Sequence, residues 1–371
     1  MKLNDENNCT SCMACYASCH FEAINLQENK LGVLLPKIDV SKCSGCGKCQ
    51  SICNSIKRIE FNKIKECYAC YTKNKSDIQT VTSGGAATVF TKAVIKENGY
   101  VFGTTYDFDP KVIKIEKIED VEKLKGSKYV YSYPNKIYAD VLNELIKGST
   151  CLFIGTPCQI AAVKAYCKKH SENLICVDLI CHGAPPFKYL QDWINKNAHF
   201  KDIKTVSFRG KDDYKLVMQN DRCNTEYIAQ QNEDLYFTAF SQSLIHREVC
   251  YSCPYATEKR VSDITIGDFW GLDVNALGGY SGKKSVVLIN TDKGKRFFEK
   301  IKNDMVYEKR EISEAVNGNK MLRHPTLKHI DREKFEKNYA NTHDFYKAVK
   351  KTSIRYNMIF NKIKNIILKR K

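Results

Sequence analysis

Beyond residue 66, apolar positions follow two patterns that alternate along the chain. Short apolar runs bounded by polar or glycine residues predict strands, at 100–106, 112–118, 151–154, 174–181, 203–208, 216–219, 263–266 and 286–290. Apolar positions with helical spacing predict helices, at 86–97, 136–147, 159–169, 233–247 and 293–301. This mixture predicts an α+β protein whose larger part is a body of mixed α/β structure.

The first 62 residues follow neither pattern, because cysteines dominate them. The spacing C-x2-C-x2-C-x3-C occurs twice, with Cys9, Cys12, Cys15 and Cys19 in the first run and Cys43, Cys46, Cys49 and Cys53 in the second. Between the runs, residues 31–35 predict a strand that Pro36 ends. A small ferredoxin-like fold of short strands and helices is expected for this segment.

The repeated spacing is typical of bacterial ferredoxins with two 4Fe–4S clusters, in which the fourth cysteine of each run binds the other cluster. The expected ligand sets are Cys9, Cys12 and Cys15 with Cys53, and Cys43, Cys46 and Cys49 with Cys19. His20 and Asn54 stand where proline usually follows the run, which bears on local geometry more than on cluster identity. Two zinc sites are the alternative, although zinc favours paired C-x2-C units with longer spacers.

The composition of the chain indicates the location of the protein and the kinds of partner to expect. Eighteen cysteines in a chain that shows no apolar leader favour metal ligands over disulfides, so we expect a cytoplasmic location. No apolar run is long enough for a transmembrane helix. The formal net charge of +17 suits an acidic protein, anionic lipid or nucleic acid. No nucleic-acid recognition motif accompanies the charge, so nucleic acid is not expected as a partner.

Motifs of several enzyme classes are absent from the sequence. It contains no G-x-G-x-x-G, G-x-S-x-G or His-Glu-x-x-His motif, and residues 278–283 are one residue too short for a P-loop. NAD binding on a Rossmann unit, nucleotide hydrolysis and zinc proteolysis therefore lack support.

A second group of cysteines lies at the ends of predicted elements. Cys158 starts a predicted helix, Cys181 ends a predicted strand, and Cys250 and Cys253 form a C-x2-C pair. Ligands gather at element ends when a fold converges on one site, so these four cysteines are candidates for a third 4Fe–4S cluster. Buried inert thiols are the alternative. We favour that packing role for another C-x2-C pair, Cys67 and Cys70.

Residues 66–299 resemble the beta subunit of coenzyme F-420 hydrogenase/dehydrogenase. The resemblance is carried by short stretches that occur in the family's order: Cys67-Tyr68-Ala69, Ser83-Gly84-Gly85 with Thr88, Val101-Phe102-Gly103, LKGSKYVYS at 124–132, GTPCQI at 155–160, DLICHG at 178–183, Phe208-Arg209 with Lys211, CYSCP at 250–254, and DITIGDFWG at 263–271. Many bacterial members carry an N-terminal dicluster module before this body.

The resemblance implies cofactors and a class of reaction. Members of the family bind a flavin, typically FAD, and at least one cluster in the body, which favours the third cluster on the second group of cysteines. Members from methanogens exchange electrons with coenzyme F-420. A plant branch takes electrons from ferredoxin, and bacterial branches often accompany surface-polysaccharide biosynthesis.

Several matched residues suit a bound flavin. Ser83, Gly84, Gly85 and Thr88 precede or begin a predicted helix whose first N–H groups can bind phosphate; Ser83 as a simple helix N-cap is the alternative. The remaining candidates for cofactor binding are Lys125, Ser127, Lys128, Tyr129, Thr156 and Asp268. Solvated surface lysines, or a buried cap at Asp268, are the alternatives for them.

Three residues are candidates for catalysis. Arg209 and Lys211 suit a phosphate or carboxylate group. His182, beside Cys181, suits a proton donor, or a residue that only supports the neighbouring ligand.

These observations predict domains at 1–62 (dicluster), 63–150 and 151–335 (the two parts of the body) and 336–371 (a basic helical tail). Residues 353–371 alternate apolar and basic positions, which suits peripheral membrane contact, core packing or docking of a partner. The expected function is an electron relay from a donor such as ferredoxin, through clusters and a flavin, to a small organic acceptor. Coenzyme F-420 as the acceptor, and a non-catalytic electron-transfer subunit, are the alternatives.

Overall fold

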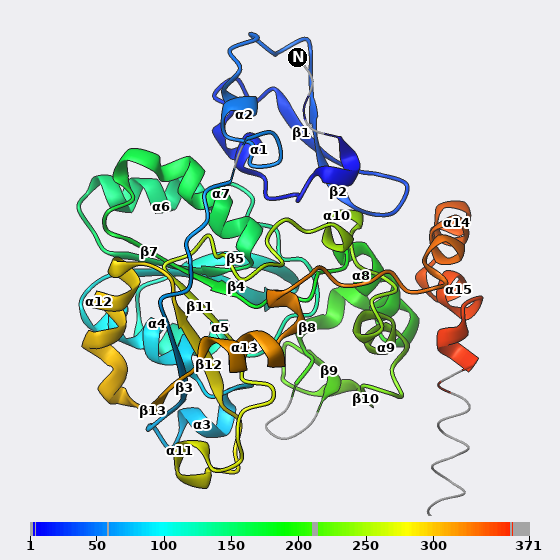
Figure 1. Cartoon of the computed structure of the whole chain (residues 1–371). Coiled ribbons are helices and arrows are strands. Elements are labelled where there is room, and N and C mark those ends of the chain that lie inside the picture. The colour runs from blue at the N-terminus through cyan, green and yellow to red at the C-terminus, as the bar shows by residue number, and fades with distance from the viewer. Residues whose placement is uncertain (1–2, 4, 58, 210–213, 357, 359–371) are drawn as a thin grey trace, which may run out of the picture.

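The N-terminal module is a small ferredoxin-like unit at one end of the molecule (Figure 1). The computed structural model describes residues 3, 5–57, 59–209, 214–356 and 358. In the module, β1 (Ile24–Glu28) pairs antiparallel with β2 (Leu34–Ile38), and the short helices η1 (Glu6–Asn8), α1 (Ala14–Ser18) and α2 (Lys48–Ser51) carry or flank the cysteine runs.

One expected strand of the module is placed differently. The strand predicted at 31–35 starts only at Leu34 and continues through Pro36, which lies opposite Leu26. A two-stranded sheet has only edge strands, so a residue without an N–H group is tolerated there. Proline therefore does not end the strand.

The body is built on one eight-stranded sheet with the order β13-β3-β12-β11-β7-β6-β4-β5. Its strands are β3 (Glu66–Thr72), β4 (Tyr100–Asp107), β5 (Asp109–Ile115), β6 (Cys151–Gly155), β7 (Leu174–Leu179), β11 (Ile264–Asp268), β12 (Ser285–Ile289) and β13 (Met305–Arg310). The four adjacent strands β4, β6, β7 and β11 run parallel, and the outer strands are antiparallel to their neighbours.

Helices cover both faces of this sheet, which explains why its central strands are apolar throughout. On one face, Phe90 of α4 (Ala86–Lys96) and Phe298 of α12 (Asp292–Ile301) share a core with Leu152 of β6. On the other face, α6 (Ile137–Ile146) and α7 (Pro157–Cys167) pack on Phe153. Leu152 and Phe153, which are neighbours in β6, thus pack into the cores on opposite faces of the sheet.

A second lobe packs beside the sheet around its own aromatic core. It combines the antiparallel strands β8 (Ile203–Ser207), β9 (Lys215–Asn220) and β10 (Thr225–Gln230) with α8 (Phe187–Asn197), α9 (Leu235–Ser241), α14 (Arg332–Thr342) and α15 (Phe345–Lys350). The remaining helices are α3 (Asp77–Thr80), α5 (Val121–Leu124), α10 (Glu248–Tyr251), α11 (Ala276–Gly279) and α13 (Ile312–Gly318), with short 3-10 turns between elements.

Two expectations for the body are corrected. The helix predicted at 233–247 is broken: α9 ends at Ser241, Ser243 adopts a left-handed conformation, and α10 begins separately at Glu248. Leu244 and Ile245 lie between the two helices and are buried, so their apolar side chains continue the helical spacing where the chain is not helical. The strand predicted at 112–118 lies at Asp109–Ile115, because it pairs in a tight hairpin with β4.

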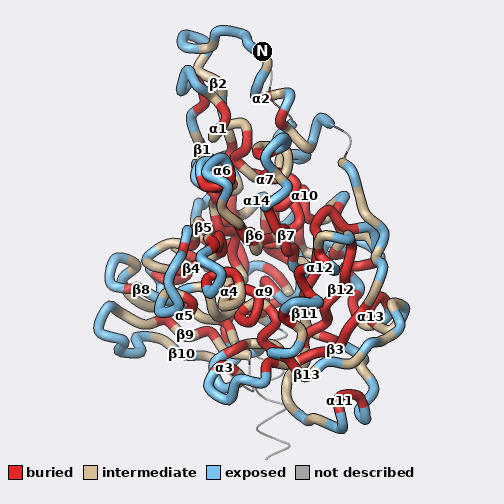
Figure 2. The backbone as a smooth tube through the Cα atoms, turned by 90° about the vertical axis from the view of Figure 1, so that its left-hand side faces the viewer, coloured by how far each residue is buried: buried red, intermediate tan, exposed pale blue. Residues whose placement is uncertain are grey.

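Burial is uneven between the two parts of the chain. Figure 2 shows buried residues concentrated in the body, whereas the N-terminal module is mostly exposed or intermediate. A module with so few buried apolar side chains gains little from a hydrophobic core, so metal ligation is needed to stabilise it. The predicted fold class, a dicluster ferredoxin-like unit followed by a mixed α/β body, is confirmed.

No helix among the described residues is long and apolar enough to cross a membrane. Most of the basic tail predicted at 353–371 lies outside the described residues.

Candidate functional site: three cysteine sets and a cavity

The fold brings the eight N-terminal cysteines together in two crossed sets. Cys53 interacts electrostatically with Cys9 and Cys15, which also interact with Cys12. Cys49 interacts in the same way with Cys43 and with Cys19 of the first run. We call Cys9, Cys12, Cys15 and Cys53 the inner set, and Cys19, Cys43, Cys46 and Cys49 the outer set. The fourth cysteine of each run therefore reaches the other set, in the arrangement that two cubanes need.

The two runs wrap their sites with the same backbone conformation. In the second run Gly45 and Gly47 are left-handed, with φ of 75° each. The equivalent residues of the first run, Ser11 and Met13, are also left-handed, with φ of 54° and 59°. This conformation is unfavourable for residues with a side chain, so the strain in the first run indicates that the ligand geometry over-determines the backbone.

The inner set is enclosed by protein. Burial raises the pKa of the Cys12 thiol to about 12 and also raises that of Cys15, because a thiolate loses its hydration there. An isolated thiol would stay protonated in such a place, whereas a bound metal removes the proton of a coordinating thiol. Thiols gathered in such a buried place thus fit a metal cluster.

The four cysteines of the body also converge, although they come from distant parts of the chain. Cys158 lies in the first turn of α7, Cys181 follows β7, and Cys250 and Cys253 lie in and just after α10. Cys181 interacts electrostatically with the other three, and all four line one small cavity. We call these four residues the body set. Gly183 is left-handed there, and a Cβ atom on it would lie 2.8 Å from His246 and 3.3 Å from Cys250.

Other cysteines lie apart from these sets. Cys67 and Cys70 are fully buried in β3, where they pack between the neighbouring strands and helices. Within the described residues, no three His, Cys, Asp or Glu side chains form a site for a single metal ion.

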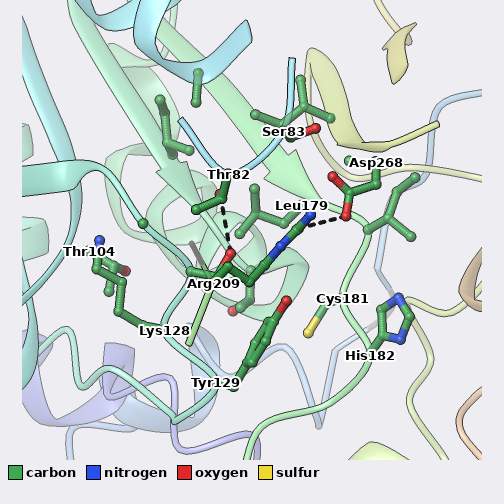
Figure 3. Close-up of a pocket in the computed structure, with 18 of the residues that line it drawn as sticks. Thr82, Ser83, Thr104, Lys128, Tyr129, Leu179, Cys181, His182, Arg209 and Asp268 are labelled. Atoms are coloured by element: carbon green, nitrogen blue, oxygen red, sulfur yellow. Dashed lines mark hydrogen bonds and ion pairs between the residues drawn. The ribbon is translucent and has the colours of Figure 1, made fainter. Parts of the chain in front are cut away.

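A cavity of about 640 Å³ opens at the carboxyl ends of the parallel strands (Figure 3). This is the usual position of ligand sites in open α/β sheets. Most of the candidate residues line it: Ser83, Gly85, Thr88, Lys125, Ser127, Lys128, Tyr129, Thr156, His182, Arg209 and Asp268. Lys211 lies outside the described residues, and Gly84 is not part of the lining.

The start of α4 forms one side of the cavity. Gly85, left-handed with φ of 88°, is the N-cap, and no side chain caps the helix. The alternative role of Ser83 as the N-cap is wrong, because its hydroxyl instead lies 3.1 Å from the hydroxyl of Ser285. Gly84 presses against the backbone of Cys70 and Ser285, where a Cβ atom would collide. The first N–H groups of α4 therefore remain available to an anionic ligand.

Two lysines of the LKGSKYVYS stretch differ in their pairing. Lys125 forms ion pairs with Asp77 at 3.0 Å and Glu122 at 2.5 Å, so its charge is already compensated. Lys128 donates instead to two backbone carbonyls, of Leu124 at 2.9 Å and of Lys125 at 2.6 Å. Protein surrounds the ammonium group and lowers the pKa of Lys128 to about 7, although part of the side chain faces the cavity. An anion in the cavity would stabilise its charged form.

Aromatic and charged side chains form the opposite wall. Tyr129 stacks on Phe240 with ring centroids 4.5 Å apart. Arg209 forms an ion pair with Asp268 at 2.7 Å, as Figure 3 shows. The Nε atom of Arg209 and the Oδ1 atom of Asp268 are buried and have no hydrogen-bond partner among the described residues.

His182 lies between the cavity and the body set. It lines both spaces, and so do Thr156, Cys181 and Gly183. Burial lowers the pKa of His182, so its imidazole is neutral at pH 7. The Thr156 hydroxyl lies 3.2 Å from the Cys158 sulfur.

The sequence analysis missed the contacts between the inner set and the body. Arg247, Tyr131, Tyr138 and Tyr166 donate hydrogen bonds to backbone carbonyls of the first cysteine run. Tyr131 lies within a stretch that carried the resemblance, and Arg247 precedes the C-x2-C pair by three positions. Their partners are more than 100 positions away in the sequence, so no local pattern could reveal them.

Two family models match parts of this chain. Residues 148–315 match the family model for the C-terminal part of the coenzyme F420 hydrogenase/dehydrogenase beta subunit, and residues 8–56 match the 4Fe-4S dicluster domain. The chain is similar to a subunit of the F(420)H(2) dehydrogenase of Methanosarcina mazei, with 22% identity over 316 residues that cover 80% of this chain and 83% of the relative. These matches confirm the resemblance and the dicluster module expected from the sequence.

The chain was also matched to a solved structure. It is a chain of the F420-reducing NiFe hydrogenase complex from Methanosarcina barkeri, with a TM-score of 0.48 and 20% identity, and the match covers 78% of this chain and 91% of that chain.

Proposed function

We propose that this chain, which joins a 4Fe–4S dicluster domain to a domain of the coenzyme F420 hydrogenase/dehydrogenase beta subunit type, is an iron–sulfur flavoprotein oxidoreductase. Electrons from a low-potential donor such as ferredoxin enter through the N-terminal module and reach an organic acceptor at the cavity. Iron–sulfur clusters supply single-electron transfer, and a flavin exchanges electrons singly or in pairs.

One observation carries this proposal: the body set and the cavity share part of their walls. Thr156, Cys181, His182 and Gly183 line both spaces. A cluster on the body set would therefore lie beside any ligand in the cavity, with only these residues between them. Electron transfer between the two sites then needs no movement of the protein.

The three cysteine sets give the relay an order. Cys12 of the inner set interacts electrostatically with Cys158 of the body set. Tyr255 interacts with cysteines of both sets, including Cys53 and Cys253. Cys46 of the outer set is exposed, which leaves this set within reach of a donor protein. Electrons therefore enter at the outer set and pass through the inner set to the body set.

The residues of the cavity suit a flavin. The uncapped start of α4 can bind the pyrophosphate, with Gly85 allowing close approach of the backbone. Lys128 supplies a cation beside the ligand, and the stacked pair Tyr129 and Phe240 forms a flat apolar wall for a ring system. The ion pair of Arg209 and Asp268 adds charged groups to the wall of the cavity, where they can orient the ring or an acceptor.

Metal and flavin analysis of the protein purified without oxygen tests the proposal. We expect about twelve iron atoms and one flavin per chain for three clusters. Cys158→Ser should lose about four of these iron atoms and leave the N-terminal clusters in place. The matched control is Cys167→Ser, at a buried cysteine of the same helix that lies outside the three sets. Zinc in place of iron, or a protein with no flavin, would contradict the proposal.

A second candidate acceptor is coenzyme F-420 itself, and the similarity to part of an F(420)H(2) dehydrogenase favours it. Absorbance of the oxidised coenzyme, mixed with the chemically reduced protein under anaerobic conditions, distinguishes the two candidates. Reduction of the oxidised coenzyme by the wild-type chain, lost in Arg209→Gln, supports this acceptor.

The same relative is named as a subunit, which also makes a non-catalytic electron-transfer role a candidate. A flavin-free protein that keeps all its clusters and forms a stable complex with a redox enzyme would favour that role.

A further inference from the structure

Arg247 occupies the boundary between the inner set and the body set, and it is buried, with only 4% of its surface exposed. Its Nη1 atom donates to the carbonyl of Thr10 at 2.5 Å, and its Nε atom donates to the carbonyl of Ala184 at 3.2 Å. Thr10 follows Cys9 of the inner set, and Ala184 lies three positions after Cys181 of the body set. One guanidinium thus binds the backbone beside both sets.

The same guanidinium also faces the sulfur atoms. Burial raises the pKa of the Cys158 thiol, whereas the charge of Arg247 lowers it, and the guanidinium also interacts electrostatically with Cys9 and Cys250. Its central carbon lies 3.6 Å from the centre of the Tyr131 ring, which covers one face of the cation.

The charge of Arg247 has no carboxylate partner among the described residues. Each of the other three arginines with little exposure, Arg209, Arg260 and Arg332, forms an ion pair with an aspartate or glutamate. A buried cation without an anion is very unfavourable, and arginine stays protonated in proteins. The anionic groups that remain to compensate it are the thiolates of the two cysteine sets.

We propose that Arg247 is a positioning residue shared by two clusters, which raises the reduction potential of the cluster on the body set and holds the inner set against it. This inference rests on the clusters of the proposed function. A 4Fe–4S cluster with four thiolates gains one negative charge on reduction, so a nearby fixed cation stabilises the reduced form.

Other bonds keep the boundary closed when Arg247 is replaced. Tyr131, Tyr138 and Tyr166 donate to the carbonyls of Ser11, Cys12 and Ala17 at 3.1, 2.9 and 3.3 Å. A variant that lacks the guanidinium therefore keeps three contacts between the first cysteine run and the body, so the potential can be measured in a folded protein.

The test is a redox titration of the whole chain followed by electron paramagnetic resonance. Three variants are compared with the wild type: Arg247→Met, Arg247→Lys, and the control Lys136→Met. Lys136 forms an exposed ion pair with Glu22 at 2.9 Å across the same boundary, so its loss tests general effects on docking. The signal that is missing in Cys158→Ser identifies the cluster of the body set.

We expect Arg247→Met to shift the midpoint potential of the body-set cluster to more negative values and to weaken the magnetic coupling between that cluster and the inner one. Arg247→Lys should retain most of the potential, because it retains the charge, and Lys136→Met should match the wild type. An unchanged midpoint in Arg247→Met with full iron content would overturn the inference. Equal shifts in Arg247→Met and Arg247→Lys would also overturn it, because packing and not charge would then be the cause.

The iron content distinguishes a failure of this inference from a failure of the proposed function. A wild-type chain with about eight iron atoms, and not twelve, lacks the third cluster and contradicts both. Twelve iron atoms with an unshifted potential contradict only the role of Arg247. If Arg247→Met loses iron, Arg247→Gln replaces it in the comparison with Arg247→Lys. An unchanged midpoint potential in Arg247→Gln, or equal shifts in Arg247→Gln and Arg247→Lys, would then overturn the inference.

Discussion

The hydroxyl group of Tyr138 donates a hydrogen bond to the backbone carbonyl of Cys12 at 2.9 Å, and it is fully buried in doing so. Tyr138 belongs to α6 of the body, and Cys12 belongs to the inner set of the N-terminal module. The body and the N-terminal module therefore meet at a cluster ligand. Electrons that pass between them cross this contact, so its geometry affects their transfer.

Tyr138→Phe removes this bond and leaves the ring packing in place. We expect a loss of about 1 to 2 kcal/mol in the free energy of unfolding, because the carbonyl of Cys12 becomes unsatisfied in a buried place. Denaturant unfolding of the cluster-loaded protein measures the loss. Tyr166→Phe removes a longer bond of 3.3 Å at the edge of the same boundary and should cost less. An equal cost at both positions would contradict a special role for Tyr138.

Ser11→Gly should stabilise the N-terminal module. Ser11 is left-handed with φ of 54°, and its buried hydroxyl has no hydrogen-bond partner among the described residues. Glycine adopts this conformation without strain, so we expect a gain of about 1 kcal/mol. The rate at which cluster absorbance is lost in denaturant reports the gain. Thr10→Gly, at the neighbouring position without a left-handed backbone, should accelerate the loss, and a slower loss in that variant would contradict the argument.

The affinity for FAD should depend on pH through Lys128. Its pKa is about 7 without a ligand because burial disfavours the ammonium form, and a bound anion raises the pKa. Binding therefore takes up a proton above pH 7. The affinity should be constant below pH 7 and fall by up to about tenfold per pH unit above it. Quenching of flavin fluorescence by cluster-loaded, flavin-free protein measures this.

Lys128→Met should bind FAD more weakly at pH 6 and lose this pH dependence. Lys123→Met is the control, since Lys123 is exposed on the neighbouring helix α5 and should leave the profile unchanged. A profile that persists in Lys128→Met would assign the titration to another group.

Cys70→Ala should leave iron and flavin content unchanged. The thiol is fully buried in β3 within a hydrophobic core, so its loss creates a small cavity. We expect the protein to be destabilised by about 1 to 2 kcal/mol. Metal analysis with thermal unfolding checks both parts, and a loss of iron would show that Cys70 is a ligand after all.

Sequence spacing was enough to predict what depends on neighbours along the chain. The ferredoxin-like module follows from ligands three positions apart. The position of Cys158 in the first turn of α7 follows from the strand before it and from Thr156 and Pro157, which begin the helix. The family resemblance gathered the residues of the cavity, which share no local pattern. In the first case the spacing along the chain determines the local structure. In the second case a motif shared with the family identifies residues that lie far apart in the sequence.

The predictions that were wrong or missing concern residues whose structure depends on contacts between distant segments of the chain. Pro36 was expected to end a strand, yet it pairs within one because no further strand lies beside it. Leu244 and Ile245 imitate a helix from a turn because the core of the second lobe buries them there. Arg247 escaped notice because its partner Thr10 is 237 positions away.

The outer set is the least protected of the three. Cys46 is exposed, and a Cβ atom on Gly45 would meet nothing within 4 Å. Oxygen and other diffusing oxidants thus reach this end of the chain first, and a partner protein seated on it would shield it. A chain whose outer cluster had been destroyed by air could still hold two intact clusters and yet be cut off from its supply of electrons.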